Sequence, residues 1–279
     1  MKYAVKVAYT LRKLLLSALG ASLLLGVLIG FLNSRDGGSF VKPFLCALIA
    51  YLILSLALIF LIASTLKKEE PLQKILAEKG YGDDYLQEFD RIYPAQTTSN
   101  KLRKADVLNT MQRYAEAEQL LATIPTVGLS DDRKMEYHNC RLDLFLGSHR
   151  IQEAMQELAN CRQFMDIYAN AHPERGVAYG LNAGVILAAA GDYEGSEHYI
   201  KAAEHTLEGM KEQSPVLAMI ARTMQLYALG FDRQAEEQAA KTRQEIETSP
   251  ILSEEWQKQH MRSLLARAAE LAPQNTTKE

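Results

Sequence analysis

Two long uncharged runs near the N-terminus constrain this chain more than any other feature. The first covers residues 14–32, which is 19 residues, and the second covers residues 44–66, which is 23 residues. A helix rises 1.5 Å per residue, so about 20 residues cross a hydrocarbon core of roughly 30 Å, and both runs are long enough. The link at residues 33–43 holds Arg35, Asp36 and two glycines. The sequence therefore predicts a hairpin of two antiparallel transmembrane helices.

The first run could instead be a cleaved signal peptide, because basic residues precede its apolar core. It is long for such a core, however, and no A-x-A-like site follows it, only Gly30-Phe31-Leu32-Asn33-Ser34. We therefore interpret the run as a retained span.

The basic residues that flank the runs predict an orientation. The loop between the runs offers only Arg35 and Lys42, whereas the two outer flanks hold Lys2, Lys6, Arg12, Lys13, Lys67, Lys68 and Lys74. Basic flanks stay on the cytoplasmic side of a membrane. We expect a multi-pass protein with both termini cytoplasmic. A compact two-span protein without a targeting leader suits a bacterial plasma membrane, and a eukaryotic organelle membrane stays open.

Small residues recur at every fourth position of the first run, at Ala18, Ser22, Gly26 and Gly30. This spacing lets helix backbones approach closely in a membrane, and Gly26-x-x-x-Gly30 is a literal GxxxG. The stripe could pack against the second run, form a homo-oligomer through the first span, or have no role. Neither run contains Asp, Glu, Lys, Arg or His, which argues against an ion or proton pathway.

The remainder of the chain is acidic. Of 31 basic and 34 acidic residues, six basic residues and one acid lie in 1–66, which leaves 25 basic and 33 acidic residues in 67–279. A net-acidic domain without a basic stripe is a poor binder of phosphate backbones, so nucleic acid is excluded as a partner. The three cysteines show no metal-ligand spacing and fit a reducing compartment.

Residues after the membrane region show helical periodicity with hardly a strand signal. Pro71 is expected to begin a short helix that ends at residue 79, and Asp83-Asp84 to begin another. Four helix pairs follow: residues 101–111 with 114–124, 131–146 with 151–168, 177–190 with 193–211, and 215–229 with 233–247. A last helix at 253–271 stands alone. The predicted fold is all-α, a two-helix transmembrane hairpin followed by a helical-hairpin solenoid.

The pairs look like repeats of one unit. Small residues early in each second helix, Ala117, Ala154, Ser196 and Ala235, are 37, 42 and 39 residues apart. That spacing is typical of an array in which each hairpin buries its apolar face on its neighbours. In the best unit, small residues at Ala183, Gly184, Ser196 and Ala203 flank the turn Gly191-Asp192-Tyr193.

These residues make the chain similar to the tetratricopeptide repeat family, over about residues 100–248. The first unit adds Ala105, Leu108, Tyr114, Ala117 and Leu121, and the fourth adds Leu226, Gly230 and Ala235. The spacing exceeds the family's usual 34 residues, and Arg222 and Thr223 stand where the family prefers apolar and small residues. The polar final helix, with Trp256, resembles the solvent-facing cap of such arrays.

The resemblance implies that a protein or peptide binds on the concave face. In the third unit this face would include Ala178, Leu181, Asn182 and Val185. Asn182 matches one position of the family's carboxylate-gripping subclass, but Leu217 and Ala221 stand where the next unit should supply cations. A carboxylate clamp is therefore not expected.

The sequence offers no convincing catalytic or metal-binding motif. His138 lies on an apolar stripe and is read as a core or groove histidine rather than a base; His198 and His205 lack the i, i+4 spacing of a zinc pair. Cys140 and Cys161 are read as buried thiols. No nucleophile elbow, zinc-protease, P-loop or dinucleotide-binding pattern occurs. We therefore expect no enzyme activity and no cofactor.

Together these features predict a membrane-anchored scaffold or adaptor for protein–protein interaction. Its regions would be a basic cytoplasmic N-terminus (1–13), the transmembrane hairpin (14–66), juxtamembrane helices and a linker (67–99), the repeats (100–248), and a capping helix with a polar tail (249–279). One alternative is an assembly factor of a membrane complex that acts through its spans. A less favoured one is an enzyme or ligand sensor with a pocket around His138 and Cys140.

Overall fold

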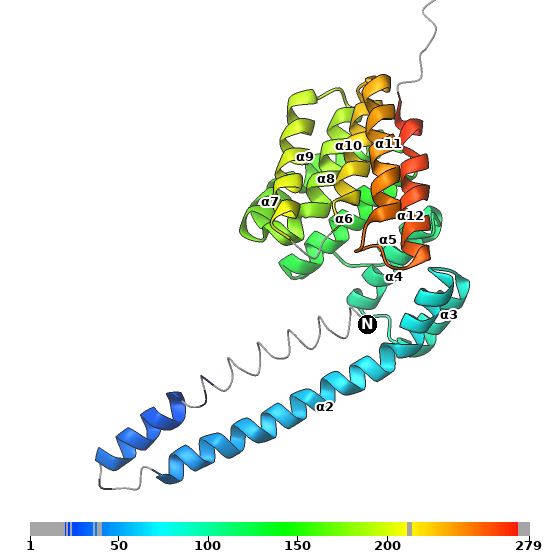
Figure 1. Cartoon of the computed structure of the whole chain (residues 1–279). Helices are drawn as coiled ribbons and strands as arrows, with labels where there is room; N and C mark the ends of the chain where they lie inside the picture. The colour runs from blue at the N-terminus through cyan, green and yellow to red at the C-terminus, as the bar shows by residue number, and fades with distance from the viewer. Residues whose placement is uncertain are drawn as a thin grey trace, which may run out of the picture. The chain divides into compact units, whose positions relative to one another are not determined.

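A computed structural model describes residues 20, 22, 24–35, 37, 41–210 and 214–272, and these residues contain helices and turns but no strand (Figure 1). The all-α fold class is therefore confirmed. The chain divides into two compact units, residues 1–74 and residues 75–279.

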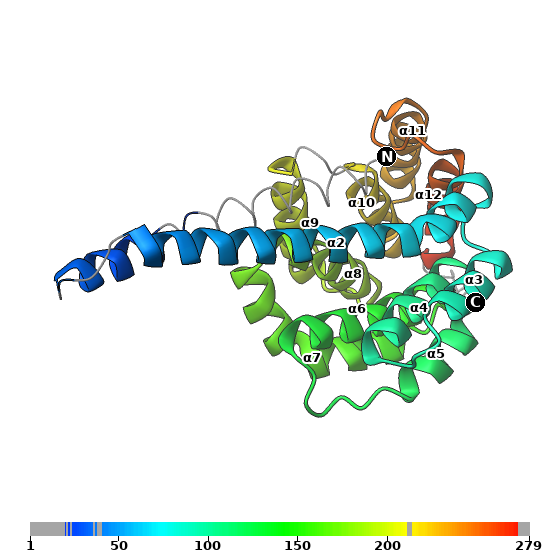
Figure 2. The same ribbon diagram turned by 90° about the horizontal axis from the view of Figure 1, so that it is seen from below.

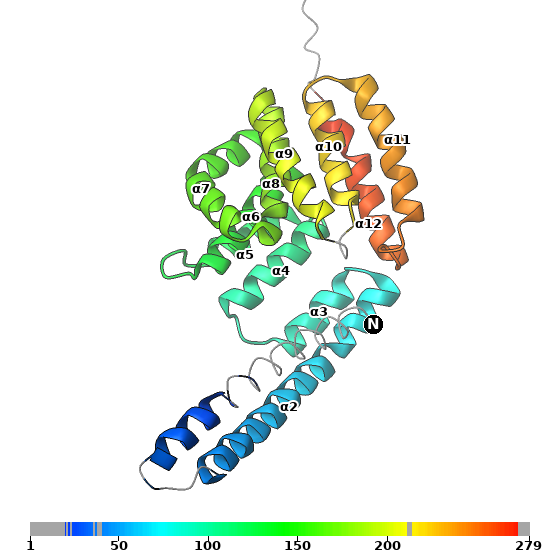
Figure 3. The same ribbon diagram turned by 60° about the vertical axis from the view of Figure 1, so that its left-hand side comes forward.

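The first unit contains the apolar helices. Helix α2 (Val41–Lys79) includes Leu45–Lys79, which is the one helix among the described residues long and apolar enough to cross a membrane. The described part of the first run is a shorter apolar helix, Leu24–Arg35, which lies beside the beginning of α2 (Figures 1 and 3). One candidate span is thus present, and crossing by the whole first run stays a prediction.

The small-residue stripe of the first run is only partly described. Ala18 lies outside the described residues, whereas Gly26 and Gly30 are buried and Ser22 is half-buried. The aliphatic side chains around them are exposed; Leu24, for example, keeps 74% of its surface. Gly26 and Gly30 thus lie on the covered side of their helix, and the packing of two spans through this stripe stays a prediction.

Helix α2 differs from the expected layout, because it runs without a break through Pro71 to Lys79. The prediction of a new helix at Pro71 is wrong. Proline removes one backbone hydrogen bond, but Lys67, Lys68, Glu69 and Glu70 are strong helix formers. These charges end the apolar run without ending the helix.

The second unit holds α3 (Asp83–Ile92) and then four helix pairs close to the expected ranges. The pairs are α4 (Thr98–Thr110) with α5 (Tyr114–Ala122), α6 (Asp131–Gly147) with α7 (Ile151–Ala171), α8 (Pro173–Ala189) with α9 (Tyr193–Glu208), and α10 (Val216–Ala228) with α11 (Asp232–Thr248). Helix α8 begins four residues earlier than expected, because Pro173 suits a first helical turn, where its missing N–H costs nothing.

All four pairs turn in the same way. Each has a residue with left-handed φ between its two helices: Gln112 at 60°, His149 at 57°, Gly191 at 81° and Gly230 at 76°. The four positions are 37, 42 and 39 residues apart, the same separations as the small residues of the second helices. The pairs are therefore repeats of one unit in a common register.

The closest helix pair is α8 with α9. A Cβ atom added at Gly184 would lie 2.6 Å from Cγ1 of Ile200 and 3.2 Å from the carbonyl oxygen of Ser196, and one added at Gly180 would lie 3.3 Å from Cβ of Ala203. The glycines and small residues of this pair thus permit a backbone approach that larger side chains would prevent.

Three polar residues of α10 have structural partners. Arg222 on α10 donates from Nε to Oε1 of Glu204 at 3.1 Å and also pairs with Glu197, so it ties α10 to α9. Gln225 donates from Nε2 to Oγ of Ser196 at 2.9 Å. Thr223 is fully buried and donates to the carbonyl of Met219.

The C-terminal helix, expected to follow the four pairs unpaired as a cap, packs against the fourth pair. Helix α12 (Glu255–Ala266) and the 3-10 turn η1 (Ala268–Leu271) both pack on α10, and Leu265 joins a core with Val216 and Ile246 (Figures 1 and 2). Trp256 contacts Tyr81 edge-on, with ring centroids 5.3 Å apart.

The same C-terminal segment also reaches the first two repeats. Gln112 donates from Nε2 to Oγ of Ser263 at 3.1 Å, and Arg267 donates to the hydroxyl of Tyr114 at 2.5 Å and to the carbonyl of Gly147. His149 lies 2.6 Å from a carboxylate oxygen of Glu270. The array therefore closes on itself around its concave face.

Candidate functional site

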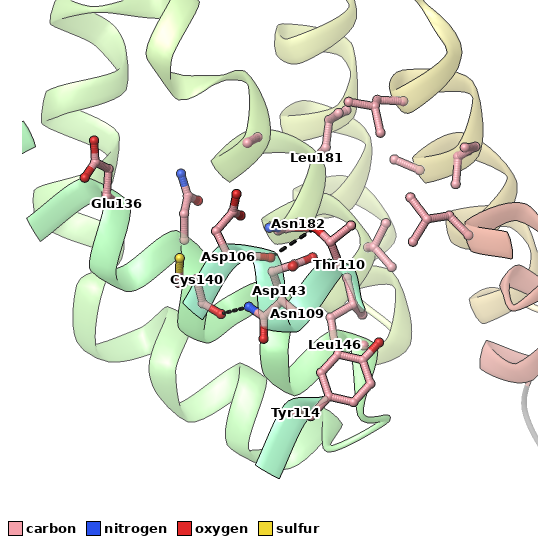
Figure 4. Close-up of a pocket in the computed structure, with 18 of the residues that line it drawn as sticks. Asp106, Asn109, Thr110, Tyr114, Glu136, Cys140, Asp143, Leu146, Leu181 and Asn182 are labelled. Carbon is pink, nitrogen blue, oxygen red and sulfur yellow. Dashed lines mark hydrogen bonds between the residues drawn. The ribbon is translucent and has the colours of Figure 1, made fainter. Parts of the chain in front are cut away.

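The closed array surrounds a cavity of about 690 Å³. The first helix of every pair, α4, α6, α8 and α10, contributes to its wall, and α12 and η1 complete it (Figure 4). Its size lies within the range of small-ligand sites, roughly 300–1,000 Å³.

The repeat register explains which residues line the cavity. Counting back from the left-handed turn residue, positions 6, 9, 10 and 13 face the cavity in all four units. In chain order these residues are Ser99, Leu102, Arg103 and Asp106; Glu136, Asn139, Cys140 and Asp143; Ala178, Leu181, Asn182 and Val185; and Leu217, Ile220, Ala221 and Met224. Each first helix thus turns the same stripe inward.

The four residues predicted for the concave face are the third of these sets. Ala178, Leu181, Asn182 and Val185 all line the cavity, with Leu181 and Val185 buried and Asn182 half-buried. Their role in binding stays a prediction. Leu217 and Ala221 line the cavity beside them and bring no charge to it.

The cavity has two unlike walls. The polar wall, from α4 and α6, carries Asp106, Asn109, Glu136, Asn139 and Asp143. The apolar wall, from α8, α10 and α12, carries aliphatic side chains apart from Asn182 and His260: Leu181, Val185, Leu217, Ile220, Met224 and Leu264. Figure 4 labels Asp106, Glu136 and Asp143 on the first wall and Leu181 on the second.

The arginines of the cavity already hold partners. Arg133 pairs with Glu136. Arg267 donates to Tyr114 and Gly147 and lies 3.6 Å from Glu270. Arg103 donates to the hydroxyl of Tyr85 at 3.3 Å and lies over the ring of Phe89, 5.2 Å from its centroid.

The carboxylates of Asp106 and Asp143, unlike the arginines, lack partners among the described residues. Neither has a hydrogen bond or ion pair to any part of the chain that the structure describes, although both side chains are accessible from the cavity. Enclosure by protein raises the pKa of Asp143 to about 7; the nearby charge of Asp106 adds to the rise and Arg267 opposes it. Enclosure and Glu136 also raise the pKa of Asp106. The polar wall therefore presents two unpaired, mutually repelling carboxylates, a frequent feature of functional sites.

The other residues considered for chemistry do not converge on the cavity. Nδ1 of His138 lies 2.7 Å from Oε1 of Glu157, which joins α6 to α7, and His138 is not among the cavity residues. Cys140 lines the cavity, but burial raises the pKa of its thiol well above the usual value. Cys140 and Cys161 are free thiols. Within the described segments, no three His, Cys, Asp or Glu residues are grouped to hold a metal ion.

Comparisons with protein-family models, with curated proteins and with solved structures found no match.

Replacing Asp143 by asparagine is expected to stabilise the fold at pH 8. The carboxyl titrates at 3.8 when unperturbed and at about 7 in the fold, so its charge is unfavourable above pH 7 and the penalty fades as pH falls toward 4. Because water in the cavity screens the charge, we expect about 1 kcal/mol, or a rise in Tm of roughly 2–4 °C.

The measurement is thermal unfolding of the full chain in detergent at pH 8 and pH 4. Glu237→Gln is the control, because Glu237 is exposed on α11, outside the cavity. A gain in Tm at pH 4 as large as that at pH 8, or no gain at either pH, would contradict the assignment.

Proposed function

We propose that this chain is a membrane-anchored, non-enzymatic scaffold or adaptor whose tetratricopeptide-like domain holds a segment of a partner protein in its central cavity. One observation carries the proposal: equivalent positions of four repeats line one cavity, and they differ systematically, from polar in the first two units to apolar in the last two. Selection for packing alone would not require unpaired carboxylates there, because two neighbouring like charges repel each other.

The apolar helices support the anchor. In the proposal, residues 14–32 and 44–66 both cross a plasma membrane, in keeping with a bacterial protein, and the basic residues outside the hairpin keep both termini in the cytoplasm. Confinement to a membrane raises the effective concentration of the cavity toward membrane partners.

The anchor predicts how the protein fractionates. The full chain is expected to remain in the membrane pellet after extraction at pH 11, when peripheral proteins are released, and to dissolve only in detergent. A variant that begins at Leu66 should leave the pellet. Release of the full chain at pH 11 would contradict an integral anchor.

Photo-crosslinking in native membranes tests the site. A photoreactive residue at Leu181 or Leu217, both in the cavity, should yield a discrete adduct with one partner. The control position is Ile167 on α7, which is 66% exposed and does not line the cavity. Equal adducts from Ile167 and the cavity positions, or none from the cavity, would refute the proposed site.

An assembly factor that acts through its spans is a second candidate, supported by the exposed apolar side chains of both apolar helices, such as Leu24 and Phe60. Replacing both Gly26 and Gly30 by isoleucine distinguishes the two. Loss of the partner with an intact repeat domain favours the assembly factor, whereas retention favours the cavity.

A further inference from the structure

We infer that the cavity selects a peptide segment in which a lysine or arginine side chain lies next to aliphatic side chains. This inference deepens the proposed function and rests on it. It names the chemistry of the segment that occupies the cavity.

The charge of the ligand follows from which cavity groups are already paired. The guanidinium groups of Arg103, Arg133 and Arg267 have acceptors or carboxylates from the protein itself. The carboxylates of Asp106 and Asp143 have neither among the described residues. Arg133 and Arg267 lie beside the carboxylates of Glu136 and Glu270, whereas Arg103 donates to a neutral hydroxyl and keeps its charge. The two aspartates outnumber that one guanidinium, so the cavity keeps a net negative charge that a cation complements.

A buried amide on the same wall gives an independent indication. Asn109 is 4% exposed and lines the cavity; its Nδ2 donates to the carbonyl of Cys140 at 2.9 Å, but its Oδ1 has no partner (Figure 4). Oδ1 of Asn139, also on this wall, is likewise without a partner. Both oxygens are enclosed by the protein, and as unpaired acceptors they make the wall itself more negative. A negative wall favours ammonium and guanidinium groups, which are cationic and donors only.

The opposite wall defines the rest of the ligand. Leu181, Val185, Ile220 and Met224 present aliphatic surface to the same cavity, which a bare inorganic cation would leave uncovered. A peptide places a basic side chain and aliphatic side chains on neighbouring residues. A volume of about 690 Å³ accommodates several side chains rather than one amine.

Three pentapeptide probes test the inference on the full chain in nanodiscs, by isothermal titration at pH 8. They are acetyl-Ala-Leu-Lys-Leu-Ala-amide and the same peptide with Gln or Glu in place of Lys. We expect the Lys probe to bind at least tenfold more tightly than the Gln probe and the Glu probe to bind most weakly. Hexylamine, titrated in the same way, should bind at least tenfold more weakly than the Lys probe.

The variant Asp106→Asn/Asp143→Asn should weaken the Lys probe at least tenfold and leave the Gln probe unchanged, and Glu237→Gln should change neither. Both substitutions neutralise a repulsive pair, so the variant is expected to stay folded. The inference is overturned if no probe binds, or if the Glu probe or hexylamine binds as tightly as the Lys probe. It is also overturned if the double variant binds the Lys probe as tightly as the wild-type chain does. A crosslinked partner at Leu181 with no preference for the Lys probe would leave the proposed function standing and refute only this charge selection.

Discussion

Gly184→Leu is expected to unfold the repeat domain at temperatures where the wild-type domain is stable. The added Cβ alone would lie 2.6 Å from Cγ1 and 2.7 Å from Cδ1 of Ile200, a fully buried side chain, and 3.2 Å from a backbone oxygen of Ser196. The remainder of a leucine would force α8 and α9 apart. Overpacking costs typically 1–3 kcal/mol, and because backbone must move here we expect at least about 3 kcal/mol.

Thermal unfolding monitored by circular dichroism, on the full chain in detergent, measures this effect. Gly209→Leu is the matched control: Gly209 is exposed and helical in φ, and an added Cβ would meet nothing closer than 3.4 Å. The control should change stability by less than about 1 kcal/mol. Equal effects of the two substitutions would show that α8 and α9 do not pack as described.

Glu157→Ala is expected to have the second large effect and to lower the free energy of unfolding by about 3 kcal/mol. Removing one member of a buried charge pair leaves the remaining charge without a partner. Glu157 on α7 is 7% exposed and accepts from Nε of Arg141 at 2.8 Å and lies 2.7 Å from His138, both on α6. Burial opposes its ionisation, but the hydrogen bond from His138 and the charge of Arg141 outweigh it, so the pKa of Glu157 is lowered. Its contribution is therefore present above the usual carboxyl pKa and is lost as pH falls through the lowered value.

Urea unfolding at pH 7 and pH 3 checks both the size and the sign. Glu153→Ala on the same helix is the control, because Glu153 is 45% exposed and forms a surface pair with Arg150. Such pairs contribute about 0–1 kcal/mol. If Glu157→Ala were no more harmful than Glu153→Ala, the link between α6 and α7 would lie elsewhere.

Local patterns were enough to predict the helices of the array and its register. Helical periodicity and the turns at Gly191 and Gly230 fix where chain direction reverses, because these interactions lie within one hairpin. The face with Leu181 and Val185 followed from the same register. The turns at Gln112 and His149 carry left-handed φ without glycine, so they lack the sequence signal that marks the other two.

The polar wall and the closure of the array could not be read in this way. Asp106 and Asp143 become a pair only when α4 and α6 pack side by side, and alone each looks like a solvated surface acid. The repeat register could have placed both residues on the cavity wall. Each stands six residues before a turn residue, as Val185 and Met224 do. Closure depends on Arg267 reaching Tyr114, a contact between residues 153 positions apart that no local pattern encodes.

We expect asparagine at position 143 to give a more stable fold than aspartate. A residue that lowers stability in this way is expected to be kept for function, here for binding. Titration of this carboxyl near pH 7 has a consequence for the ligand. Binding of the Lys probe should weaken as pH falls from 8 to 6, because protonation of Asp143 removes one attracting charge. The other charged or titratable side chains that line the cavity around it include Asp106, Glu136, Arg103, Arg267, His149 and His260. Affinity that rises on acidification would contradict this reading.

Hydrogen exchange of the full chain in nanodiscs, with and without the Lys probe at saturation, tests most directly that the cavity is the binding site. We expect slower exchange in the inner helices α4, α6, α8 and α10, and unchanged exchange in the outer helices α5, α7, α9 and α11. Protection confined to the outer helices, or spread evenly over both sets, would contradict binding in the cavity.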